Sequence, residues 1–135
     1  MTTSGEFNFV QFQNVGSKLS NYFITITKNG AFGLSSGFYN TEKIKEFTHA
    51  MIFYDSAKKL IGLVFTNTPT KKGAFKITHT KNFGSASIIA HSFFSYIFPQ
   101  NSAEKLNEIN GRYAPKIHSD ANAGSIYYID LNEKE

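Results

Sequence analysis

The alternation of apolar and polar residues predicts a chain built mainly of β-hairpins. Residues 22–27 are aromatic or β-branched and lead into Asn29-Gly30, a pair typical of a tight two-residue hairpin turn. The expected return strand, 31–38, carries large apolar side chains on one face and only Ala, Gly and Ser on the other. Glycine in a strand often marks the close approach of another backbone or a ligand, so this face could receive a second sheet, a second subunit or a flat ligand.

Two further hairpins are predicted downstream, and closing strands follow them. The second hairpin joins 50–54 to 60–66 and is apolar on both faces, which is typical of strands inside a sheet. The third joins 74–80 to 85–90 around Lys81–Gly84. The remaining expected strands are an edge strand around Phe7, Phe9 and Phe12, then 112–118 and 125–131.

Three short helices are expected between the hairpins. The first covers 42–47, with Asn40-Thr41 as its cap. The second covers 92–98 and ends before Pro99, because proline cannot continue a helix. The third covers 102–109.

These elements predict a single domain, 1–135, with an α+β fold in which antiparallel β-hairpins form a sheet and short helices pack on one face. An internal match supports two related halves, because Ile24–Asn29 agrees with Ile77–Asn82 at five of six positions. The halves would be hairpin–helix–hairpin units covering 20–70 and 71–131. A match this short also arises by chance in a chain rich in Thr and Lys. The expected core residues are Phe38, Phe53, Leu63, Phe65, Ile77, Ile88, Phe94, Ile97 and Ile129.

Composition narrows the class of protein. The 135 residues are enough to bury a core, and 41% of them are apolar, which argues against disorder. The chain has no cysteine, no signal-like N-terminus and no apolar stretch near the roughly 20 residues that span a bilayer. We therefore expect a cytoplasmic protein without a membrane partner.

Charge is distributed unevenly along the chain. The net charge is +4, but residues 18–85 hold ten lysines against three acids, a local net charge of +7. The rest of the chain holds four basic residues and seven acids, a net charge of −3. A polarised surface of this kind attracts an anionic partner, although solvated lysines are also an ordinary surface feature.

No constellation of residues indicates catalysis. The four histidines, His49, His79, His91 and His118, lack the spacings typical of metal sites. His79 shares a strand face with Phe75 and Ile77, so we interpret it as a packed or hydrogen-bonded residue. There is no P-loop, and no pair of acids is placed for general acid–base work. The sequence thus predicts a protein that is not an enzyme and has no cofactor or metal.

Lysines near the expected turns provide the clearest binding signal. If the tips of adjacent hairpins line one rim of the sheet, these lysines would neutralise phosphates while a turn phenylalanine stacks on bases. Lysine at hairpin ends also protects sheets against edge-to-edge aggregation, and the near absence of Arg counts against specific base contacts. The candidate nucleic-acid-binding residues are Lys28, Lys58, Lys59, Lys71, Lys72, Lys76, Lys81 and Phe83.

The order of elements resembles a known group of folds. The stretch 50–98 is expected to contain four strands followed by a helix, which is similar to the repeat unit of Whirly, PUR-alpha and PC4-like single-stranded-DNA-binding folds. The small-residue hairpins also resemble, loosely, swapped-hairpin AbrB-type domains. Because only the element order carries the first resemblance, it implies single-strand binding but assigns no functional residue.

Two functions follow as hypotheses. The first is a small protein that binds single-stranded DNA or RNA with little sequence preference. The alternative is a non-enzymatic interaction or assembly module, a homo-oligomer joined through exposed sheet edges or through the small-residue face of 31–37.

Overall fold

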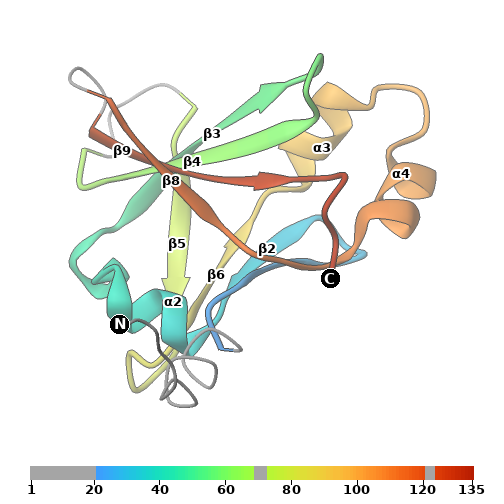
Figure 1. Cartoon of the computed structure of the whole chain (residues 1–135). Helices are drawn as coiled ribbons and strands as arrows, with labels where there is room; N and C mark the ends of the chain where they lie inside the picture. Colours follow the sequence, from blue (N-terminus) through green and yellow to red (C-terminus); the bar gives the residue numbers. More distant parts are fainter. Residues whose placement is uncertain (1–20, 69–72, 121–123) are drawn as a thin grey trace.

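The computed structural model describes residues 21–68, 73–120 and 124–135, and these residues form a curled antiparallel sheet with short helices (Figure 1). The strands are β1 (Ile24–Ile26), β2 (Ala31–Leu34), β3 (His49–Asp55), β4 (Leu60–Thr66), β5 (Phe75–His79), β6 (Ala86–Ile89), β7 (Gly111–Tyr113), β8 (Lys116–Asp120) and β9 (Gly124–Asp130). The helical elements are α2 (Ser36–Thr41), the 3-10 turn η1 (Ile44–Glu46), α3 (His91–Ile97) and α4 (Ser102–Ile109). The predicted α+β fold is confirmed. The edge strand predicted around Phe7, Phe9 and Phe12 lies outside the described residues.

The first hairpin is shorter than predicted, because β2 ends at Leu34 and a helix follows at once. Ser35 is the N-cap of α2: its Oγ accepts hydrogen bonds from the amides of Phe23, at 2.9 Å, and Phe38, at 3.3 Å. A capping serine satisfies an amide that a helix start leaves without a partner. The strand predicted through 38 and the helix predicted at 42–47 are therefore wrong, and α2 and η1 take their place.

The predicted small-residue strand face is also interrupted. Gly33 lies in β2, whereas Gly37 lies in α2. A Cβ atom on Gly37 would clash with the carbonyl oxygen of Asn21, so glycine is required for this close approach. Gly37 serves contact within the chain and is not part of a flat outer face.

The strand order is β7-β1-β2-β6-β5-β3-β4-β9-β8. From β7 to β3 it reads the same in both directions once β1 is exchanged with β5, β2 with β6 and β7 with β3. The registers agree with this two-fold relation, because Phe32 faces Ile88 and Leu34 faces Ala86 across the β2–β6 contact. The two copies of the six-residue match begin on β1 and β5, so they occupy equivalent positions.

The two ends of the strand order meet through the chain itself, because Ala114-Pro115 joins β7 directly to β8. The single strand predicted over 112–118 is therefore two strands. Pro115 has no amide hydrogen to donate to a ladder, which explains the break. After β9 the chain returns to β7, where Tyr113 pairs with Lys134.

One core fills the inner face of the curled sheet, and the helices contribute to it from both ends (Figure 1). Phe38 and Tyr39 of α2, Phe93 and Phe94 of α3 and Leu106 of α4 are all buried there. Most predicted core residues lie in this core: Phe38, Leu63, Phe65, Ile77, Ile88, Phe94 and Ile129 are buried, and Ile97 is partly buried.

Phe53 is the exception among the predicted core residues, because its side chain is 48% exposed. Ala50 is buried on β3 and Ile52 and Tyr54 pack against the core, so the alternation of a strand directs Phe53 outward. A strand that is apolar on both faces does not reveal which face is inside.

Candidate functional site

The candidate lysines do not form the single rim expected from the sequence. Lys28 lies in the β1–β2 turn and Lys81 in the β5–β6 turn. Because β2 and β6 pair antiparallel, the two hairpins point in opposite directions. The first turn contacts the start of α3, where the Ala90 amide donates to the Gly30 carbonyl at 2.9 Å, whereas the second lies beside α2.

The remaining candidate lysines occupy other places. Lys58 and Lys59 are adjacent in the β3–β4 turn, but they line two different cavities. Lys76 is exposed on β5, where its partner across the ladder is His49. Lys71 and Lys72 lie outside the described residues.

Phe83 is exposed in the β5–β6 turn, with 54% of its surface accessible and a φ of +54°. It lines a shallow cavity of about 260 Å³ beside α2. Lys43 and Lys45 line the same cavity, and the sequence did not single them out. The structure thus places Phe83 beside lysines, but these differ from the ones expected.

A larger groove lies on the outer face of β3, β4, β9 and β8, and we call it the Gly62 groove. Its volume is about 490 Å³. Gly62 is the direct cross-strand partner of Phe53 on one side and of Tyr128 on the other. Two aromatic side chains therefore flank a position without a side chain. The strands that carry them, β3 and β9, are two interstrand spacings apart, which is about 10 Å.

The floor of the groove is tightly packed. A Cβ atom on Gly62 would lie 3.2 Å from Cγ2 of Ile126, so even a methyl group would press on this neighbour. Gly62 pairs with Phe53 in the β3–β4 hairpin, and Ile126 pairs with His118 in the β8–β9 hairpin. On this face of the sheet, each of these is the second residue pair from the end where its two strands are joined. The two related hairpins thus contribute matching positions to one groove.

Charge at the rim of the groove comes from a few side chains. Lys58 and His118 line it, and Asp55 lies beside them. Oδ1 of Asp55 accepts a hydrogen bond from the Lys58 amide at 3.0 Å, which holds the turn. The nearby Lys116 is neutralised by Glu133, at 2.7 Å, so Lys58 is the lysine that this rim offers to a ligand.

Sequence reasoning missed Gly62, Ile126, His118 and Tyr128. One signal was present: Gly62 interrupts an otherwise apolar strand, and glycine within a strand often marks a place where something approaches closely. Tyr127 and Tyr128 are also adjacent on a strand, so one of them has to face outward.

Other polar groups are occupied within the protein. Nε2 of His79 lies 2.9 Å from the Phe47 carbonyl oxygen, which can only accept, so Nε2 carries the hydrogen and Nδ1 accepts from the Tyr39 hydroxyl at 2.7 Å. This geometry agrees with the interpretation of His79 as a hydrogen-bonded residue. Among residues 21–68, 73–120 and 124–135, no group of three or more His, Asp or Glu side chains is placed to hold a metal ion.

The carboxylate of Glu42, at the end of α2, accepts two tyrosine hydroxyls. Oε2 accepts from Tyr22 at 2.6 Å and Oε1 from Tyr127 at 2.9 Å. Burial is the larger cause and the hydrogen bond to Glu42 the next, and together they raise the pKa of Tyr127 to about 12. The same two causes raise the pKa of Tyr22 more strongly. Both carboxylate oxygens are thus engaged, which leaves little capacity to bind a ligand.

Comparison of the chain with protein-family models, curated proteins and solved structures found no match. None of the helices in the described residues has the length and apolar character needed to cross a membrane. A function is therefore inferred from the surface geometry of this chain.

Proposed function

We propose that the chain binds single-stranded nucleic acid, with little sequence preference, in the Gly62 groove. The observation that carries the proposal is the placement of Phe53 and Tyr128 on either side of Gly62 on an outer face. Unpaired bases stack on aromatic side chains, which contributes about 1–3 kcal/mol per base for any of the four bases.

One lysine at the groove suits the same ligand. Lys58 stands at the rim, where Asp55, which also lines the groove, holds the turn by accepting from the Lys58 amide. Lysine ammonium groups neutralise backbone phosphates without reading the bases, which fits binding without sequence preference. A duplex hides its base faces within its own stacks, so the aromatic groove favours single strands.

The direct test is fluorescence anisotropy with labelled single- and double-stranded oligonucleotides, at low and near-physiological salt. We expect single-strand binding that weakens with salt but persists at the higher concentration. Lys58→Gln removes one phosphate contact, so the plot of log K against log salt concentration should become less steep by about 0.7. Absence of single-strand binding, or equal weak binding of both forms that vanishes with salt, would overturn the proposal.

Variants locate the site. Phe53→Ala is expected to weaken binding about 5- to 150-fold, the range that corresponds to losing one stacked base. Tyr96→Ala is the matched control, because this aromatic side chain is 83% exposed and does not line the groove. Phe83→Ala tests the β5–β6 turn separately. If Phe53→Ala binds single strands as the wild type does and Phe83→Ala binds them more weakly, the binding site is at the β5–β6 turn and not in the Gly62 groove.

One observation favours the alternative of self-association. β8 is the last strand of the sheet order, where β9 is its partner, and Ile117 on β8 is 50% exposed. An exposed strand edge can pair with the same edge of a second copy. Light scattering after size-exclusion chromatography should then give twice the 15.1 kDa chain mass, and Ile117→Lys should restore the monomer. A monomeric wild type at every concentration would eliminate this alternative.

A further inference from the structure

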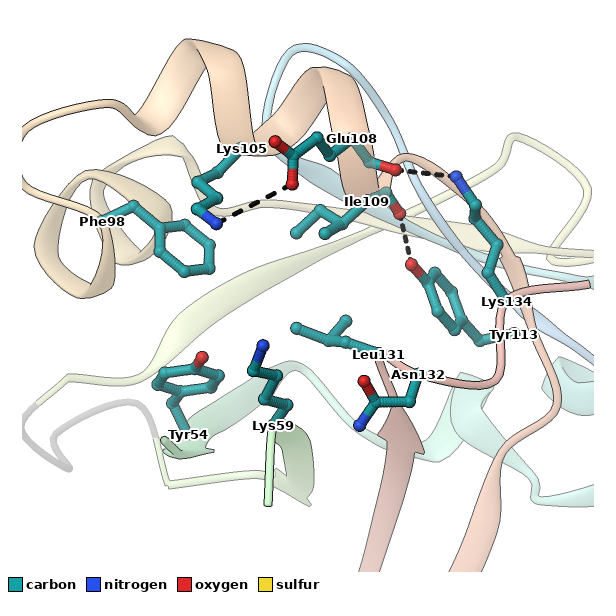
Figure 2. Close-up of a pocket in the computed structure, with 10 residues that line it drawn as sticks. All are labelled: Tyr54, Lys59, Phe98, Lys105, Glu108, Ile109, Tyr113, Leu131, Asn132 and Lys134. Atoms are coloured by element: carbon teal, nitrogen blue, oxygen red, sulfur yellow. Dashed lines mark hydrogen bonds and ion pairs between the residues drawn. The ribbon is translucent and has the colours of Figure 1, made fainter. Parts of the chain in front are cut away.

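A second cavity, which we call the lysine cavity, lies between the β3–β4 turn, α4 and the segment that follows β9 (Figure 2). Its volume is about 270 Å³. Tyr54 and Phe98 form an aromatic wall, with their rings in edge-to-face contact at 5.9 Å between centroids. Leu131 and Ile109 lie on the opposite side, so the cavity has apolar walls and a small number of polar groups.

The charged groups of the lysine cavity are mainly cationic. Its lining includes Lys59, Lys105 and Lys134 against one acid, Glu108, a local net charge of +2. Lys134 donates to the carbonyl oxygens of Glu108, at 2.7 Å, and Asn110, at 3.2 Å, so it is held at the end of α4. The positive charge available to a ligand therefore comes from the other two lysines.

Lys59 and Lys105 direct their ammonium groups into the same space (Figure 2). Lys105 is 3.8 Å from Oε1 of Glu108, and neither of the two ion pairs found among the described residues involves Lys59. Glu108 offsets part of the charge of Lys105, but the lining keeps a net charge of +2 beside apolar walls, and an anion near Lys59 and Lys105 would balance this charge.

The backbone holds Lys59 in place at this position. Its φ is +59°, in the left-handed region, and its carbonyl oxygen accepts from the Leu131 amide at 3.0 Å. The turn is thus attached to the segment that follows β9, and the backbone of Lys59 is fixed beside the cavity. Such preorganisation lowers the entropic cost of binding.

We infer that the lysine cavity binds a phosphate group. Lysine ammonium groups bind phosphate as point charges, and the Tyr54 hydroxyl that also lines the cavity is a further hydrogen-bond donor. The phosphate can belong to a free mononucleotide or to the end of a nucleic-acid strand. The inference does not depend on the Gly62 groove, which shares only Tyr54 with this cavity.

The first experiment titrates inorganic phosphate and adenosine 5′-monophosphate into the full chain by isothermal calorimetry at constant ionic strength. We expect one site, weakened at least fivefold by Lys59→Gln and by Lys105→Gln. Lys28→Gln is the matched control, because it removes the same charge from a turn beside the start of α3 and does not line the cavity. No binding of either probe, or an equal loss in the control, would overturn the inference.

A second experiment distinguishes the source of the phosphate. Two oligonucleotides of identical sequence, one with a 5′-phosphate and one with a 5′-hydroxyl, are compared by anisotropy. A phosphate-dependent gain that Lys59→Gln removes identifies a strand end, whereas binding of the mononucleotide without such a gain identifies a free ligand. Phe53→Ala should leave phosphate binding unchanged, so a failed groove and a failed lysine cavity give different results.

Discussion

The helices α2 and α3 follow equivalent hairpins, yet their ends have opposite character. The C-cap of α2 is Glu42 and that of α3 is Phe98. Each lies beside a cavity of similar volume, about 280 Å³ at Glu42 and about 270 Å³ at Phe98. One cavity contains an acid whose two oxygens are occupied by tyrosines, and the other is lined by three lysines and one acid.

This difference shows how a repeated backbone acquires a site at one end. At the α2 end, the buried polar groups bind one another, and their hydrogen bonds stabilise the fold. At the α3 end, the ammonium groups of Lys59 and Lys105 are the ones that we propose as partners of a phosphate group.

The largest effect is expected from removing an aromatic side chain of either helix. Phe38→Ala and Phe94→Ala should each lower the free energy of unfolding by about 3–5 kcal/mol, because both side chains are fully buried in one core. Urea unfolding followed by circular dichroism should give one transition for each variant. Two separate transitions would mean that the two ends unfold independently and that the shared core does not couple them.

The next largest effect is the difference in stability between variants of Glu42 and of Lys59. Glu42→Leu leaves two partly buried tyrosine hydroxyls without their acceptor and should cost about 1–3 kcal/mol. Lys59→Gln should change stability by less than about 0.5 kcal/mol, as for a surface residue. Glu46→Leu, at an exposed position in η1, is the matched control for the first variant. Equal costs for Glu42→Leu and Glu46→Leu would contradict the stabilising role of the tyrosine pair.

Phosphate itself should separate the two ends. A ligand that binds only the folded state adds about 1.4 kcal/mol of stability at ten times its Kd. Phosphate should therefore raise the unfolding midpoint of the wild type and of Glu42→Gln relative to chloride at equal ionic strength. The rise should be smaller in a Lys59→Gln, Lys105→Gln double variant, which keeps only the general stabilisation of folded proteins by phosphate. A rise equal to that of the wild type would place the anion elsewhere.

The smallest effect concerns the ionisation of tyrosines at the two ends. The pKa of Tyr127, beside Glu42, and of Tyr113, at the lysine cavity, is about 12, against an ordinary value of 10. The folded state therefore favours the neutral phenol, and stability should be complete below pH 10 and decline as pH rises towards 12.

Absorbance at 295 nm can follow this ionisation. Burial alone raises the pKa of Tyr113, whereas Glu42 contributes to that of Tyr127. Glu42→Gln should therefore lower the ionisation range of Tyr22 and of Tyr127 and leave that of Tyr113 in place. Titration of all tyrosines near pH 10 in the folded wild type would contradict both assignments.

Local signals predicted much of the fold. The hairpin of β3 and β4 lies where its β-branched runs placed it, α3 ends before Pro99 as predicted, and α4 covers the predicted range 102–109. Ser35 was harder to interpret, because a serine beside glycines suits a strand end as well as a helix cap. The outward direction of Phe53 could not be predicted, since β3 is apolar on both faces and has no distinguishing period.

The candidate sites depended on contacts between distant residues. The Gly62 groove needs β9 beside β4, and the lysine cavity brings Lys59, Lys105 and Lys134 together from three separate segments. A turn lysine can be recognised in a sequence, but which turns share an end of the sheet depends on strand pairing. The antiparallel β2–β6 contact placed Lys28 and Lys81 apart, whereas the sequence suggested that they would meet.

The two-fold register has a consequence for assembly. The pairings of β2 with β6 and of β4 with β9 join strands β1 to β4 to the rest of the sheet, and so do the pairings of β1 with β7 and of β3 with β5. A chain of only one half would therefore leave these strand edges without their partners. It would need a second copy to complete the sheet, whereas within one chain each half can carry its own charge.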